Sequence, residues 1–61
     1  MKKDNMIRIL NVSDVADLLS MKVSWVRQRV HREEIPYYKI GNLVRFNYDD
    51  IAEWLRSKKE I

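Results

Sequence analysis

The chain has 61 residues, of which 46% are hydrophobic and 34% charged, and its formal net charge of +3 allows an anionic partner without requiring one. A chain of this length buries only about 60% of the surface that its unfolded form exposes, which favours a binding module over an enzyme with a deep catalytic pocket. It has no cysteine, which excludes a disulfide framework and a cysteine-ligated zinc site, so packing must stabilise the fold.

The N-terminal third of the chain predicts a short anchoring segment and a helix. Ile7–Leu10 is an apolar run whose pattern fits either an opening strand or a simple anchor. Ser13 can cap a first helix over about Asp14–Ser20, in which the apolar residues form one wide stripe. Because an isolated helix of this length is marginal in water, it must pack on another element.

A second helix is predicted from about Val23 to Arg32. At helical spacing Val23, Val26 and Val30 share one side, which indicates the buried stripe. The opposite side is polar and mostly basic, and it collects Ser24, Trp25, Arg27, Gln28, His31 and Arg32. Two helices joined by about three residues, the second with a basic outer face, are typical of a helix-turn-helix.

A β-hairpin follows the only proline, Pro36, which ends helical continuation. Two β-prone quartets, Tyr37–Ile40 and Leu43–Phe46, flank the turn pair Gly41-Asn42. The pairing sets Tyr38, Ile40, Leu43 and Arg45 on one face, and Tyr37, Lys39, Val44 and Phe46 on the other. Neither face is cleanly polar, so the pattern leaves open which one packs inward.

The C-terminal segment predicts a third helix capped by Asn47. Asp50 stands in the reciprocal position of a capping box, and Phe46 is placed to pack against Ile51 as a hydrophobic staple. The hairpin and the third helix are therefore expected to be coupled.

Basic side chains gather in the middle of the chain. Residues 22–46 hold six Lys and Arg side chains against two Glu, a net charge of +4, whereas residues 10–21 and 47–61 are net acidic. This asymmetry fits a face that meets phosphates, and it fits a solvated face equally well.

Together the elements predict a mainly α fold that contains a helix-turn-helix and a small β-hairpin. One domain is expected over residues 7–57, between a flexible N-terminus at residues 1–6 and a frayed tail at residues 58–61. No run of residues is apolar and long enough to span a membrane, and the N-terminus lacks the apolar segment of a secretory signal, so a cytoplasmic protein without membrane contact is expected.

The order of these elements resembles the excisionase-type family of small winged helix-turn-helix DNA-binding domains, together with the related MerR-like and AlpA-like classes. The resemblance rests on Val12–Leu19, Ser24–Arg27, Ile35-Pro36, Lys39–Gly41, Val44–Phe46 and Asp50–Leu55. Two positions depart from the family pattern. Ser20 stands where the family often has a turn glycine, and Glu33 stands where a glycine often ends the recognition helix.

The resemblance implies that the second helix enters the major groove of double-stranded DNA while the hairpin acts as a wing beside the backbone or minor groove. A guanidinium fits guanine O6 and N7, and a carboxamide fits adenine N6 and N7. The candidate contacts are Arg27, Gln28, Ser24 and His31 for base edges, Lys22, Arg32 and again Ser24 for phosphates, Lys39, Asn42 and Arg45 for the wing, and Trp25 for an apolar base contact. Burial in the core is an equal alternative for Trp25.

The leading hypothesis is a sequence-specific DNA-binding protein that is not an enzyme and uses no metal or other cofactor. As an excisionase it would bind attachment-site repeats and direct an integrase toward excision; as a small transcriptional regulator it would act at a promoter on RNA polymerase. One module of this size buries only about 600–1,000 Å² on DNA, so self-association on DNA is expected. A protein-interaction module that uses Trp25 and Tyr37-Tyr38 is the alternative without DNA binding, and RNA binding stays open as well.

Overall fold

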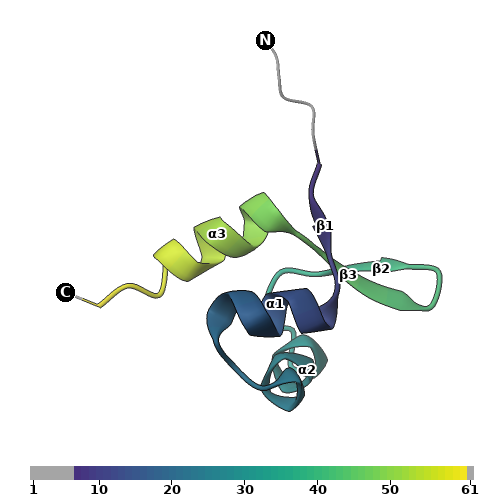
Figure 1. The fold of residues 1–61 in the computed structure, drawn as a ribbon, viewed down its shortest axis with the longest axis horizontal. Helices are drawn as coiled ribbons and strands as arrows, with labels where there is room; N and C mark the ends of the chain where they lie inside the picture. The colour runs from purple at the N-terminus through teal and green to yellow at the C-terminus, as the bar shows by residue number, and fades with distance from the viewer. Residues whose placement is uncertain (1–6, 61) are drawn as a thin grey trace, which may run out of the picture.

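The computed structural model describes residues 7–60, which form three helices and a small three-stranded sheet (Figure 1). In chain order the elements are β1 (Ile9–Leu10), α1 (Val12–Leu19), α2 (Val23–His31), β2 (Tyr38–Ile40), β3 (Leu43–Asn47) and α3 (Tyr48–Arg56). The mainly helical fold with a hairpin wing is therefore confirmed. The expected flexible N-terminus, residues 1–6, lies outside the described residues, as does the last residue of the expected frayed tail.

The sheet is antiparallel throughout, with the strand order β1-β3-β2, so β3 is the central strand. The hairpin has the predicted register, in which Ile40 pairs with Leu43 across the turn. Leu10 pairs with Phe46 at the other edge of β3, which decides the open question about the N-terminal apolar run in favour of a strand. This short strand holds the start of α1 against the base of the hairpin.

One face of the hairpin packs inward and the other is open to solvent. Phe46 is fully buried and Val44 is half-buried against the core. On the opposite face Tyr38, Ile40 and Leu43 are each more than half exposed. The inward face is thus the one that carries Val44 and Phe46.

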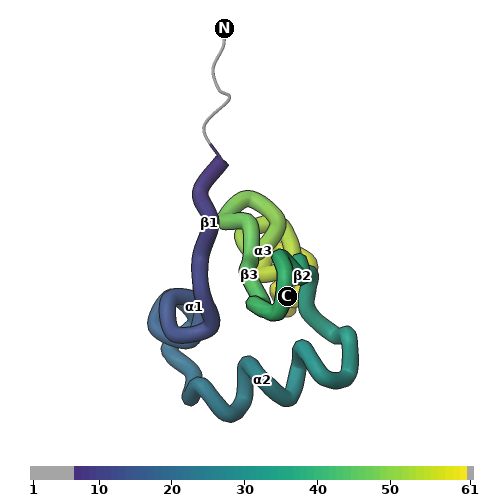
Figure 2. The backbone as a smooth tube through the Cα atoms, turned by 90° about the vertical axis from the view of Figure 1, so that its right-hand side faces the viewer, coloured from purple at the N-terminus to yellow at the C-terminus, as the bar shows by residue number. Residues whose placement is uncertain are grey.

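The core consists of one small cluster of buried apolar side chains to which each helix contributes. Its members are Val15 and Ala16 from α1, Val26 from α2, Ile35 from the following loop, Phe46 from β3 and Ile51 from α3. In Figure 2 α2 runs along one side of the molecule, and the hairpin and α3 lie across from it. Since no single element could bury its apolar stripe alone, this shared core is what fixes α2 relative to the wing.

The first helix begins earlier than predicted, because Asn11 and not Ser13 is its N-cap. The Asn11 side chain accepts a hydrogen bond from the Asp14 backbone N–H at 2.7 Å, and the Asp14 carboxylate accepts one from the Asn11 N–H at 3.0 Å. This reciprocal capping box satisfies two backbone donors, which a cap at Ser13 would have left to water. Ser13 is instead an exposed residue inside the first turn.

The third helix has the predicted N-cap but lacks the predicted reciprocal bond. The Asn47 side chain accepts a hydrogen bond from the Asp50 N–H at 3.1 Å. The Asp50 carboxylate does not return to Asn47, because it accepts a hydrogen bond from the Tyr38 hydroxyl at 3.0 Å. Phe46 and Ile51 lie together in the buried cluster, as the staple requires.

The buried side of α2 is rotated relative to the predicted valine stripe. Val26 is fully buried and Val30 half-buried, but Val23 is 38% exposed. Trp25 and Arg29 are half-buried in its place. The reason is that α1 and α3 both lie on the Trp25 side of the helix, where they line a groove with it.

Both departures from the glycine pattern adopt the left-handed backbone that glycine favours. Ser20 has φ of 57° and Glu33 has φ of 55°. After α1 the Met21 N–H donates to the Ala16 carbonyl at 2.9 Å, and after α2 the Glu34 N–H donates to the Arg29 carbonyl at 2.8 Å. These bonds close both helix ends as Schellman motifs, so the turn geometry is kept without glycine.

Replacement of either residue by glycine should therefore stabilise the protein. A left-handed conformation costs a non-glycine residue about 1–2 kcal/mol, and the greater unfolded-state freedom of glycine offsets about 0.5–1 kcal/mol of that gain. We expect Ser20→Gly and Glu33→Gly each to raise the free energy of unfolding by about 0.5–1 kcal/mol and the Tm by about 2–8 °C. Ser13→Gly, the same change inside α1, should give no gain, and a lower Tm for Ser20→Gly would contradict the assignment.

Two valines on α2 test which side of this helix faces the core. Val26→Ala should lower the free energy of unfolding by about 2 kcal/mol and the Tm by roughly 8–16 °C, because it removes fully buried methyl groups. Val23→Ala should change the free energy by less than about 0.5 kcal/mol, since its side chain is exposed. Thermal unfolding followed by circular dichroism measures both, and equal losses would mean that the buried side is the one the valine spacing predicted.

Candidate nucleic-acid interface

The four residues predicted to contact base edges share one exposed face of α2. Ser24, Arg27, Gln28 and His31 follow each other at i, i+3, i+4 and i+7, which places them in one row along the helix. All four are exposed, and the row lies on the side of the helix opposite Val26. The structure thus brings these side chains together on a single surface, which we call the recognition face.

The recognition face is flanked at both ends by cations. Lys22 is the N-cap of α2 and Arg32 is its C-cap, and both side chains are exposed. The N-cap makes no side-chain hydrogen bond to the first turn, so the first amide groups of α2 stay open to an anion or to water. Between the two cations α2 contains no acidic residue.

The wing candidates divide between two places. Lys39 and Asn42 are exposed near the tip of the hairpin. Arg45 is half-buried nearer its base, where its Nη1 donates a hydrogen bond to the Val44 carbonyl at 2.8 Å. Lys39 pairs with Val44, so it points to the inward side of the hairpin, whereas Arg45 points to the outer side with Tyr38. The structure therefore places Lys39 and Asn42 together near the tip of the hairpin, and it places Arg45 on the opposite face from Lys39.

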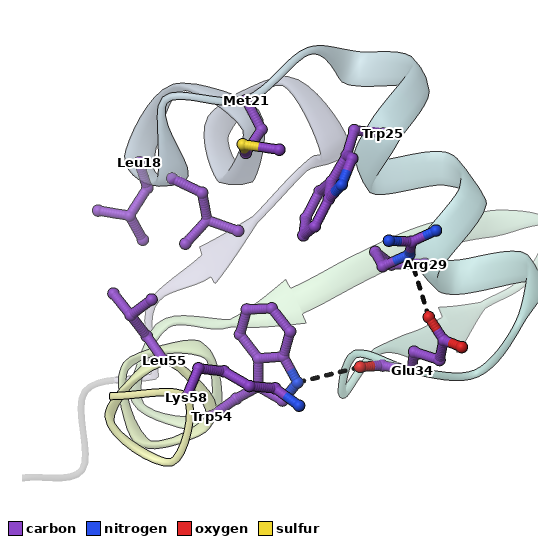
Figure 3. Close-up of a pocket in the computed structure, with 9 residues that line it drawn as sticks. Leu18, Met21, Trp25, Arg29, Glu34, Trp54, Leu55 and Lys58 are labelled. Atoms are coloured by element: carbon purple, nitrogen blue, oxygen red, sulfur yellow. Dashed lines mark hydrogen bonds and ion pairs between the residues drawn. The ribbon is translucent and has the colours of Figure 1, made fainter. Parts of the chain in front are cut away.

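Trp25 lies at the border of the recognition face, where it lines a hollow together with Ser24 and Gln28. Its indole is half-buried and forms part of the wall of a groove between the helices (Figure 3). The Arg29 guanidinium lies over the ring with its Cζ 4.9 Å from the ring centroid. Of the two roles weighed for this residue, the position favours packing.

Two contacts that link distant parts of the chain were not predicted. The Tyr38 hydroxyl donates to the Asp50 carboxylate, which ties the wing to the first turn of α3. The Trp54 indole N–H donates to the Glu34 carbonyl at 3.0 Å, which ties the end of α3 to the loop after α2. Both pairs are twelve or more residues apart, so no local spacing could have indicated them.

The carboxylate of Asp50 also changes the titration of its partner. It raises the pKa of Tyr38 above the ordinary value of 10.0, because it accepts the hydroxyl hydrogen bond and because its negative charge disfavours the phenolate. Within residues 7–60 the His, Asp and Glu side chains form no cluster of three that could hold a metal ion. No helix in the same range is long and apolar enough to cross a membrane.

A family model described as a helix-turn-helix domain matches residues 9–59. The chain belongs to the helix-turn-helix domain family. This confirms the predicted resemblance and the winged helix-turn-helix fold, in which α1 and α2 are the two helices and the β2–β3 hairpin is the wing. The helix-turn-helix match supports a DNA-binding protein. The chain matches no curated protein and no solved structure.

The link between wing and α3 in this helix-turn-helix domain can be measured through the tyrosine. In Asp50→Asn the pKa of Tyr38 should fall toward 10, because the substitution removes the negative charge. A raised folded-state pKa means that the link stabilises the wild-type protein below pH 10 and that this contribution is lost as the pH rises through the raised value. Titration of the tyrosine ring carbons by NMR measures the shift, and an unchanged pKa in Asp50→Asn would show that the two groups are apart in solution.

Proposed function

We propose that the protein is a sequence-specific double-stranded DNA-binding protein of the excisionase type. The observation that carries the proposal is the recognition face, a row of four exposed hydrogen-bonding side chains on a helix that holds no acidic residue and is flanked by cations. An α-helix fits the major groove of B-DNA, where base edges present a distinct pattern of donors and acceptors. Such a row can follow the floor of the groove while the ends of the helix meet the backbone.

Each side chain has a chemical role in this proposal. Arg27 would bind guanine through O6 and N7, and Gln28 would bind adenine through N6 and N7, with Ser24 and His31 completing the row. Lys22 and Arg32 would contact phosphates, which orient the protein without specifying sequence. The wing would add backbone or minor-groove contacts through Lys39 and Asn42, and through Arg45 if its guanidinium leaves the Val44 carbonyl.

Several copies would act together. A single module buries about 600–1,000 Å² on DNA, so useful affinity calls for neighbouring copies or a second protein. In the excisionase role, copies on attachment-site repeats would direct an integrase toward excision. In the role of a small regulator, the same contacts would place the protein at a promoter near RNA polymerase. A recombination assay with an integrase separates the two, since only the first role makes excision depend on this protein.

The direct test is selection of binding sites from a random duplex pool at near-physiological salt, followed by titration of the selected site across a salt series. We expect an enriched motif and a log K that falls with log salt by about 0.9 for each phosphate neutralised. Repeats within the motif would reveal how copies assemble. The absence of enrichment, with weak and salt-insensitive binding, would reject the proposal and favour a protein-interaction module.

Two substitutions separate base contacts from backbone contacts. Arg27→Ala should cost about 1–3 kcal/mol on the selected site and relax the preference at one base pair. Lys39→Ala should weaken selected and random DNA alike and reduce the salt slope by about 0.9. Electrophoretic mobility shifts or fluorescence anisotropy on both DNAs measure this difference. If Arg27→Ala lost the same affinity on both, Arg27 would be a backbone contact.

A further inference from the structure

An apolar groove of about 680 Å³ lies between α1, α2 and α3 and has no role in the proposed DNA contacts. Its apolar lining comes from the end of α1, the following turn, α2 and α3, namely Leu18, Leu19, Met21, Trp25, Trp54 and Leu55. Figure 3 shows the two tryptophans on opposite sides of the groove, with the Arg29–Glu34 pair at one end. Both tryptophans of the chain are therefore in this one place.

Three apolar residues of the groove, Leu19, Trp25 and Trp54, pack against the core, and the other three are open to solvent. Leu18 and Leu55 are 44% and 48% exposed, and Met21 is exposed as well. Apolar side chains that gather in one open concavity, bordered by polar groups, mark an interaction site more often than scattered ones do. An apolar partner that covers these side chains removes their surface from water, which is favourable.

The walls of the groove are held in place before any partner arrives. The Trp54 indole N–H already donates to the Glu34 carbonyl, so that the ring presents only apolar surface to the groove. The Trp25 ring lies against the Arg29 guanidinium, whose Nε is 3.1 Å from Glu34 Oε1. A preformed site of this kind loses little side-chain freedom on binding.

The charged side chains at the edge of the groove indicate which charge a partner should carry. Arg29 and Glu34 offset each other as an ion pair. Lys58, whose Nζ lies 5.4 Å from the Trp54 ring centroid, pairs with no carboxylate within the described residues. The charged lining of the groove thus has a net charge of +1, from Arg29 and Lys58 against Glu34, which makes an acidic partner the better match.

We propose that this groove docks an acidic amphipathic helix from another protein. The apolar stripe of that helix lies between Trp25 and Trp54, and a carboxylate at its edge meets Lys58, which is the helix-in-groove mode of peptide recognition. Trp25 and Arg29 lie beside the recognition face, since Trp25 borders a hollow with Ser24 and Gln28 and the Arg29 guanidinium donates to Gln28 Oε1 at 3.4 Å. The inference goes beyond DNA binding and stands without it, because none of the DNA contacts proposed above is made by a residue that lines the groove.

Two synthetic peptides of about 16 residues test the proposal on the full chain. Both carry leucines at positions that form one helical stripe, and they differ only in flanking glutamates or flanking lysines. The labelled acidic peptide should bind saturably by fluorescence anisotropy, and the basic peptide should bind roughly fivefold or more weakly. No saturable binding, or equal binding of the two peptides, would overturn the proposal.

Matched variants separate the groove from the rest of the surface. Leu55→Ser should weaken binding of the acidic peptide roughly tenfold, while Leu43→Ser, on a similarly exposed leucine of the wing, should leave that binding unchanged. Lys58→Glu should reverse the preference between the peptides, and Lys39→Glu should impair DNA binding alone.

Self-association of the wild-type protein in sedimentation, if Leu55→Ser abolished it, would instead show that a second copy occupies the groove. A peptide that binds while DNA does not would leave this proposal standing and reject the proposed function.

Discussion

The burial of Phe46 is the contact on which the arrangement of this small domain depends. Phe46 lies on the central strand, pairs with Leu10 of β1 and immediately precedes the N-cap of α3. Its fully buried ring lies in the one core cluster, to which all three helices contribute. Because that cluster is small, a few buried side chains hold α2 and the wing, the two surfaces expected to meet DNA, in one arrangement.

The backbone at both ends of α2 shows how a helix-turn-helix can keep its geometry without glycine. Ser20 and Glu33 adopt left-handed conformations, which L-residues avoid because Cβ then crowds the carbonyl oxygen. The hydrogen bonds of the two Schellman motifs and the packing of the helices hold them there. The backbone strain is confined to these two residues. The orientation of α2 relative to α1 is thus kept with a serine at the turn in place of a glycine.

Local patterns were sufficient for the parts of the fold that depend on neighbouring residues. The hairpin register and the Asn47 cap follow from turn and capping residues within a few positions of each other. The Asn11 cap of α1 carries the same local signal, because Asn11 precedes Asp14 by three residues as Asn47 precedes Asp50, and the prediction of Ser13 missed it. Trp25 differs, because its burial depends on where α1 and α3 pack. For the candidate site, the row on α2 followed from helical spacing, while the position of Arg45 and the groove required the tertiary structure.

The two sides of α2 also have a spectroscopic consequence. Both indole fluorophores of the chain face the groove, and the row from Ser24 to His31 has none. Trp25 also borders a hollow that it shares with Ser24 and Gln28, so intrinsic emission reports on the groove, on unfolding and on the flank of the recognition face. A change in emission when DNA is added would therefore report on that flank of the nine-residue helix, without a label on either molecule.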